Sequence, residues 1–130
     1  MADRIVVLID ALNVARSRWP HLSQRALIER CRSWAHDHGH RALVVFDGSL
    51  PEELLSTPEA DSVCGVVATG GESADDWIAR HAGELARRDE PYWLVTSDRE
   101  LRRRAGTASR REIGGGSFLK HLGLEGPGGS

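Results

Sequence analysis

The sequence predicts an α/β fold: a central, mostly parallel sheet of four to five strands with helices on both faces. Residues 5–9 read IVVLI, an apolar run without polar alternation, which is typical of a strand covered on both faces. Runs of this kind alternate along the chain with segments of helical periodicity, the pattern of parallel βαβ units. At 130 residues the chain has the length of one domain.

The first half of the chain supplies three of the strands. After the strand at 5–9, the next expected element is a long helix with Ser23 as its N-cap and Gly39 as its C-terminal stop. Residues 41–48 predict a second buried strand that ends in an acid. A loop with room for a helical turn follows, and a third strand is expected at about 62–68.

The second half supplies the remaining strands. Ser73 is the expected N-cap of a second long helix. A fourth strand, YWLVTSD, and a short helix closed by Gly106 follow it. The segment REI at 111–113 predicts a short fifth strand, and Ser117 is the expected cap of a last helix.

Composition narrows the classes of function. The net charge of -2 at pH 7 predicts no general affinity for polyanions, so a nucleic-acid site must be local. Cys31 and Cys64 lack CxxC spacing and resemble reduced core thiols, which predicts a cytoplasmic protein. No apolar run approaches the ~20 residues of a membrane span, and no signal-peptide pattern is present. We expect a monomer or weak homodimer, with one domain over 1–122 and a flexible tail over 123–130.

Acidic residues follow the predicted strands. Asp10 follows the first strand, Asp47 the second and Asp98 the fourth. Because the carboxyl ends of parallel strands meet at one edge, where such sheets bind ligands, these acids are expected to lie together. Glu72 and Asp75 begin the helix after the third strand, and Asp75 flanks the apolar face of that helix.

Clustered carboxylates need a counter-charge. Two of them ~4 Å apart repel by about 4 kcal/mol at an effective dielectric of 20, so a cluster holds protons or binds a cation. Oxygen ligands favour Mg²⁺ or Mn²⁺, which can activate a water and stabilise the leaving oxygen of a phosphate. Asn13 and Ser97 can add neutral ligands or donors. By contrast, a single acid at a strand end is more often a turn or cap residue, and Asp76 is expected to cap or meet solvent.

Four segments in order, LIDALNVA, VVFDG, GESADDWI and LVTSDRELRRRA, resemble the motifs of NYN-type, PIN-like nucleases, closest to the YacP-like group. The resemblance covers about residues 4 to 122. It implies a single Rossmann-like, PIN-type α/β domain and metal-dependent hydrolysis of RNA phosphodiester bonds. It also implies a catalytic set and a metal-ligand set, which are Asp10, Asn13, Asp47, Asp75 and Asp98 for catalysis, and Asp10, Asp47, Glu72, Asp75 and Asp98 for the metal. Relatives commonly show D-G-Y-N, whereas Ala11 and Leu12 stand here, so an aromatic that could stack on a base is missing.

Basic residues follow the last of these acids. Six arginines lie within residues 99–111, where they would hold RNA phosphates beside the acidic centre. Alternatively, these arginines form a solvent-exposed helix face and pair in part with Glu100 and Glu112. His36, His38 and His40 alternate like a metal tract but straddle a helix end away from the acids. The predicted RNA-binding residues are Arg16, Arg18, Ser97, Arg99, Arg102, Arg103 and Arg110.

The leading hypothesis is therefore a ribonuclease, expected to be an endonuclease, that depends on Mg²⁺ or Mn²⁺. The alternative is a catalytically weak or inactive RNA-binding module of the same fold. A small-molecule phosphohydrolase is disfavoured because no DxD nucleophile motif begins at Asp10. DNA stays open as a substrate, because phosphate contacts do not read the sugar.

Overall fold

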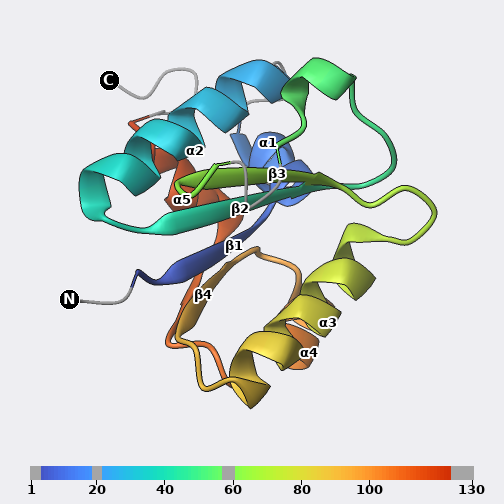
Figure 1. The fold of residues 1–130 in the computed structure, drawn as a ribbon, viewed down its shortest axis with the longest axis vertical. Helices are drawn as coiled ribbons and strands as arrows, with labels where there is room; N and C mark the ends of the chain where they lie inside the picture. The colour runs from blue at the N-terminus through green and yellow to red at the C-terminus, as the bar shows by residue number, and fades with distance from the viewer. Residues whose placement is uncertain (1–3, 19–21, 57–60, 124–130) are drawn as a thin grey trace.

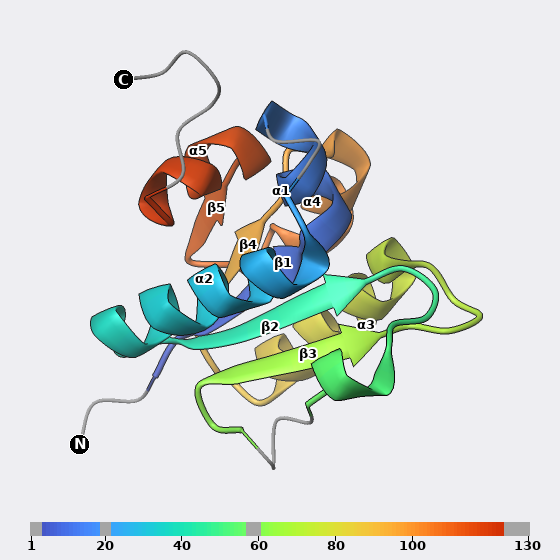
Figure 2. The ribbon, with the colours of Figure 1, turned by 90° about the horizontal axis from the view of Figure 1, so that it is seen from above.

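The computed structural model describes residues 4–18, 22–56 and 61–123. Its centre is a sheet of five parallel strands in the order β3-β2-β1-β4-β5 (Figures 1 and 2). The strands are β1 Val6–Asp10, β2 Arg41–Phe46, β3 Cys64–Ala68, β4 Tyr92–Val95 and β5 Arg111–Ile113. The predicted α/β fold with a parallel sheet is confirmed.

Helices cover both faces of this sheet (Figures 1 and 2). One face carries α1, α2 and α5, and the other carries α3 and α4. Their bounds are α1 Ala11–Arg18, α2 Gln24–His38, α3 Ala74–Arg87, α4 Arg99–Ala105 and α5 Gly115–His121, and a 3-10 turn, η1, spans Glu52–Leu54. Among the described residues, none of these helices is long and apolar enough to span a bilayer.

Strand β1 explains the unbroken apolar run at residues 5–9. Val7 and Ile9 pack into the layer under α1, α2 and α5, whereas Val6 and Leu8 pack into the layer under α3 and α4. Successive side chains of a strand point to opposite faces, so a strand covered on both sides needs apolar residues at every position. Each such buried side chain contributes roughly 1.5–3 kcal/mol relative to an exposed one.

The predicted helix ends are largely confirmed. The Ser23 side chain accepts a hydrogen bond from the amide of Ala26 (3.0 Å), and Gly39 closes α2 with a φ of 70°. Ser73 caps α3 by accepting from the amide of Asp76 (3.0 Å). A left-handed C-terminal residue favours glycine, which has no Cβ to clash.

One helix was missed, and the predicted start of another is wrong. Helix α1 was not expected: it starts directly from β1, without a loop, because the Asp10 carboxylate accepts the Asn13 amide (3.4 Å). The last helix begins after Gly114 and not after Ser117. The amide of Gly115 donates to the Ser97 side chain (2.9 Å), so a distant hydroxyl satisfies the first turn that Ser117 was expected to cap.

Strand β3 forms one edge of the sheet, and a short antiparallel contact covers part of it. Ser56 and Val66 exchange two backbone hydrogen bonds (2.8 and 3.4 Å). The Ser56 hydroxyl also donates to the carbonyl of Cys64 (3.0 Å). These contacts occupy outward-facing backbone groups of β3 that would otherwise be open to another strand.

Candidate active site

Four predicted acids lie at the carboxyl edge of the sheet. Asp10 is the last residue of β1, and Asp47 directly follows β2. Asp75 is the second residue of α3, which follows β3, and Asp98 caps α4 after β4. Because β3, β2, β1 and β4 are consecutive neighbours in the sheet, the strand order brings these four positions together.

Asp10 is the buried member of the group, with 6% of its surface exposed. Thr96 donates a hydrogen bond from Oγ1 to Asp10 Oδ2 (3.1 Å), and the Asn13 amide donates to Oδ1. Burial raises the pKa of Asp10 from 3.8 to about 6, although both hydrogen bonds lower it. The negative charges of Asp75 and Asp47 raise it further.

Asp75 is electrostatically linked to the same acids. Its pKa is raised first by burial and then by the charges of Asp98 and Asp47, while Arg104 acts in the opposite direction. The fields of Asp10, Asp47, Asp75 and Asp98 therefore overlap at one edge of the sheet. A cation placed there would relieve the repulsion between them.

Three of these acids also cap helices. The carboxylate of Asp10 accepts from an amide of α1, that of Asp47 from the Ala74 amide of α3 (2.7 Å), and that of Asp98 from the Leu101 amide of α4 (3.0 Å). A helix N-terminus favours a negative charge because its amides are unpaired. The same three acids can therefore serve both as helix caps and as members of a metal-binding group. Capping holds each carboxylate in place.

Thr96 is a site residue that the sequence reasoning missed. It is fully buried, and its hydroxyl donates to Asp10 and accepts from the Asp98 amide (3.1 Å). Its carbonyl accepts from Nε of Arg102 (2.8 Å). Thr96 therefore ties two of the acids together. The available signal was a hydroxyl residue at the end of a buried strand, two positions before an acid.

Asn13 and Ser97 lie next to each other at the same edge. Asn13 Oδ1 accepts from the Ser97 amide (2.8 Å), which joins α1 to the loop after β4. The Ser97 hydroxyl accepts from Gly115, as described above, so it supports α5. Leu12, the neighbour of Asn13 on α1, is 39% exposed and leaves an apolar surface beside Asn13.

Glu72 and Asp76 are engaged outside the group of four. Glu72 forms a two-pronged ion pair with Arg80 of α3, with 2.9 Å between Arg80 Nη2 and Glu72 Oε2. Asp76 is exposed, as expected, and pairs with Arg104 of α4 (2.8 Å). Glu72 would have to release Arg80 before it could ligate a metal.

The arginines of the predicted RNA-binding set occupy different places. Arg16 is exposed on α1, the helix that starts directly after Asp10, and Arg99 is exposed at the start of α4, directly after Asp98. Arg103 is exposed and paired with Glu100. Arg102 is half-buried, where it holds the Thr96 carbonyl and lies 3.8 Å from Glu112.

Two predicted arginines stand apart from this group. Arg110 precedes β5, and its amide donates to the carbonyl of Tyr92 (2.9 Å) at the start of β4. It therefore lies at the amino edge of the sheet, the end opposite the acids. Arg18 ends α1, and its side chain lies outside the described part of the chain.

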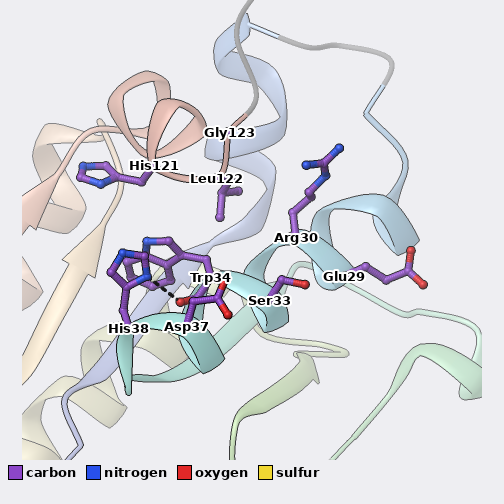
Figure 3. Close-up of a pocket in the computed structure, with 9 residues that line it drawn as sticks. All are labelled: Glu29, Arg30, Ser33, Trp34, Asp37, His38, His121, Leu122 and Gly123. Carbon is purple, nitrogen blue, oxygen red and sulfur yellow. Dashed lines mark hydrogen bonds between the residues drawn. The ribbon is translucent and has the colours of Figure 1, made fainter.

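The histidine tract has a different environment. His38 donates a hydrogen bond from Nδ1 to the Trp34 carbonyl (2.9 Å), and His40 packs against Trp93 with 4.6 Å between ring centroids. Figure 3 shows His38 and His121 at one end of a pocket of about 450 Å³ between α2 and the end of α5. These histidines form an aromatic cluster with Trp34 and Phe118, away from the carboxyl edge of the sheet.

The donor set suits a hard divalent cation. All four grouped side chains are carboxylates, and their charges act on one another, as the raised pKa values of Asp10 and Asp75 show. Within the described ranges, no three His, Cys, Asp or Glu side chains already stand in an arrangement that could hold a metal ion. Asp10, Asp47, Asp75 and Asp98 are the residues that would hold one at this edge.

A family model for the YacP-like NYN domain matches residues 7–111. The chain belongs to this family. The resemblance noted in the sequence is thus confirmed. The matched range contains all four grouped acids together with Thr96 and Asn13. Nucleases of the NYN type are typically metal-dependent, and RNA is the substrate that the family suggests.

Solved structures support the fold of this NYN domain. Rae1 (YacP) from Bacillus subtilis is 22% identical over 93% of this chain and 74% of that chain, with a TM-score of 0.66. A tryptophan-to-leucine mutant of the same protein is 20% identical over 92% of this chain and 75% of that chain, with a TM-score of 0.68. No match was found among curated proteins.

Proposed function

We propose that this NYN domain is a divalent-metal-dependent endoribonuclease whose site is the group formed by Asp10, Asp47, Asp75 and Asp98. The observation that carries the proposal is the mutual effect of these carboxylates. Burial, together with the neighbouring charges, brings the pKa of Asp10 to about 6, so Asp10 adds its charge to the group mainly above that pH. Such a concentration of negative charge favours a cation as its ligand.

The residues around the acids have matching roles. When bound, Mg²⁺ or Mn²⁺ would polarise the phosphodiester and make a bound water more acidic. Asn13 is fixed by the Ser97 amide, so its side chain has one defined position beside the acids. Arg16 lies one helical turn after Asn13, and Arg99 directly follows Asp98. Both are exposed and suited to hold the phosphates of an RNA strand.

The remaining predicted residues take supporting parts in this proposal. Glu72 is a reserve metal ligand that is held by Arg80. Arg102 acts through Thr96 as a positioning residue, and Arg103 contributes positive charge at the rim. Arg110 lies at the other edge of the sheet, so it can contact only a distant part of a long RNA.

The alternative is an RNA-binding module without turnover. The observation that favours it is capping: Asp10, Asp47 and Asp98 each satisfy a helix amide, which is reason enough for an acid at these positions without catalysis. A purely structural set of acids predicts RNA binding through the arginines and no cleavage in any divalent metal.

A cleavage assay separates the two functions. Purified protein is incubated with a labelled structured RNA in Mn²⁺, in Mg²⁺ and in EDTA, together with Asp47→Asn. Asp75→Asn and Asp76→Asn form a matched pair, because they are adjacent on α3 and only Asp75 belongs to the group of four. The nuclease predicts metal-dependent cleavage that Asp47→Asn and Asp75→Asn abolish and Asp76→Asn retains. RNA binding without cleavage, or equal cleavage by all variants, would overturn the proposal.

A further inference from the structure

The amino edge of the sheet carries arginines where the carboxyl edge carries acids. Arg41 is the first residue of β2, Arg4 lies two residues before β1, and Arg88 follows α3 on the way to β4. Strands β2, β1 and β4 are adjacent, about 4.8 Å apart. The three arginines therefore converge at one end of the sheet, roughly 17 Å, the length of a five-residue strand, from the acids.

These arginines line a pocket of about 420 Å³, together with Val6 and the turn Asp89–Pro91. The turn is well ordered by hydrogen bonds: the Glu90 amide donates to the Leu85 carbonyl (2.9 Å), and Asp89 takes a left-handed φ of 58°. This is the closing geometry of a helix end, which fixes the chain at Arg88. The pocket is thus largely formed before any ligand arrives.

The guanidinium groups of the pocket have few protein partners. Within the described ranges, Arg4, Arg41 and Arg88 form no ion pair, and Arg4 alone donates a side-chain hydrogen bond, to the Ser62 carbonyl (3.0 Å). The Nε atom of Arg41 is buried and has no hydrogen-bond partner. Folded proteins leave few buried donors unsatisfied, so an unpaired one indicates a missing acceptor.

By contrast, several arginines of α3 and α4 are engaged. Arg80, Arg102 and Arg104 each pair with a carboxylate of the protein. In the amino-edge pocket the three arginines outweigh Asp89 and Glu90, which leaves a net positive charge. The positive charges of Arg88 and Arg41 also act on His81, whose pKa is lowered mainly by burial and further by these two arginines.

We propose that this pocket binds a phosphate group through Arg4, Arg41 and Arg88. The planar guanidinium fork matches phosphate oxygens in pairs, and the hydrogen bonds that it donates to an anion are charge-assisted. The volume also accommodates a nucleoside attached to the phosphate. The phosphate belongs either to an RNA backbone or to a free mononucleotide. The first case rests on the proposed function, whereas phosphate binding itself does not.

Nuclear magnetic resonance of the Arg41 Nε–Hε group tests the proposal directly. The signal is assigned by its loss in Arg41→Lys and followed while inorganic phosphate or adenosine monophosphate is added without divalent metal. We expect a saturable shift, with affinity about tenfold weaker in Arg88→Gln. Arg25→Gln, which removes an exposed arginine from α2, should bind like the wild type. No saturable shift, the same shift with sodium chloride at equal ionic strength, or unchanged binding by Arg88→Gln would overturn it.

A second measurement identifies the source of the phosphate. Binding of a short labelled RNA is followed by fluorescence anisotropy in EDTA over a series of salt concentrations. If the pocket holds an RNA phosphate, Arg88→Gln lowers the slope of log affinity against log salt by about 0.7, and the mononucleotide competes. If it holds a free mononucleotide, Arg88→Gln leaves RNA affinity unchanged. Both measurements exclude metal and cleavage, so their result is independent of whether Asp47→Asn abolishes turnover.

Discussion

Replacing Asp10 by Asn should stabilise the protein more at about pH 8 than at about pH 5. The carboxylate is buried at the end of β1 among other acids, and its pKa in the folded protein is about 6, compared with 3.8 for the ordinary group. The folded protein therefore holds the Asp10 proton more tightly than the unfolded chain does. The stability associated with this group is fully present below pH 3.8 and is lost as the pH rises through about 6.

The size of the effect follows from the two pKa values. The full rise from 3.8 to about 6 corresponds to about 3 kcal/mol of folding free energy, since one pKa unit is about 1.4 kcal/mol. Integrating proton binding between about pH 5 and pH 8 leaves about 1.4 kcal/mol of this loss within the accessible range. Asn carries no charge, so the variant escapes that loss. Effects of the substitution that do not depend on pH cancel when the two pH values are compared.

Urea unfolding of the wild type and Asp10→Asn at both pH values, without divalent metal, measures the quantity. The free energy of unfolding of the variant minus that of the wild type should be more positive at about pH 8 by about 1.4 kcal/mol. Asp37→Asn is the control for the loss of one negative charge, because that side chain is 72% exposed. A difference that is equal at the two pH values, or larger at about pH 5, would refute the burial argument.

Three further predictions concern the same edge and the core. Mg²⁺ at about a hundred times its dissociation constant should raise the free energy of unfolding of the wild type by about 2.7 kcal/mol and that of Asp10→Asn by less. Equal increases in the thermal stability of the two proteins, measured by calorimetry, would contradict a metal site at these acids. Thr96→Val should lower the free energy of unfolding in urea by about 1–3 kcal/mol, because it removes the hydrogen bond to Asp10 and leaves the Asp98 amide unpaired. A decrease below about 0.5 kcal/mol would contradict the role of Thr96. Burial raises the pKa of the Cys64 thiol to about 11 and that of the Cys31 thiol well above its ordinary value. A disulfide reagent at about pH 8 should therefore modify neither cysteine in the folded protein and both after unfolding. Rapid labelling of the folded protein would contradict this.

The sheet was predictable because each of its signals is local. The apolar run 5–9 required cover on both faces, and Ser23, Gly39 and Ser73 mark helix ends by chemistry within a few residues. The same signals predicted the order of elements along the chain. Gathering the acids at one edge then needed only the rule that parallel strands end on the same side.

The features that sequence reasoning missed depend on contacts between distant residues or on dual roles. Helix α1 has no separate cap, since Asp10 both ends β1 and accepts the first amide bond of the helix. The start of α5 depends on Ser97, eighteen residues before Gly115. Such pairings leave no periodic trace in the sequence.

The same limit applies within the site. Glu72 looked equivalent to Asp75, but its partner Arg80 lies eight residues further on, beyond the three- and four-residue spacing of ordinary helix pairs. The burial of Asp10 and the central position of Thr96 emerge only when β1 and β4 lie side by side. Residue type and spacing could identify the candidate acids, but they could not show which of them is buried or which is held by an arginine.

The contact between Ser56 and β3 has a consequence for solubility during folding. An uncovered edge strand can accept a strand from another molecule, and β3, with the sequence CGVVA, has the apolar, β-branched character that promotes such pairing. Ser56 forms hydrogen bonds with both the amide and the carbonyl of Val66, so these groups cannot pair with a strand of another molecule. The segment after β2 therefore shields part of this edge, and a change that removed the Ser56 pairing would expose it without altering any residue of the acidic group.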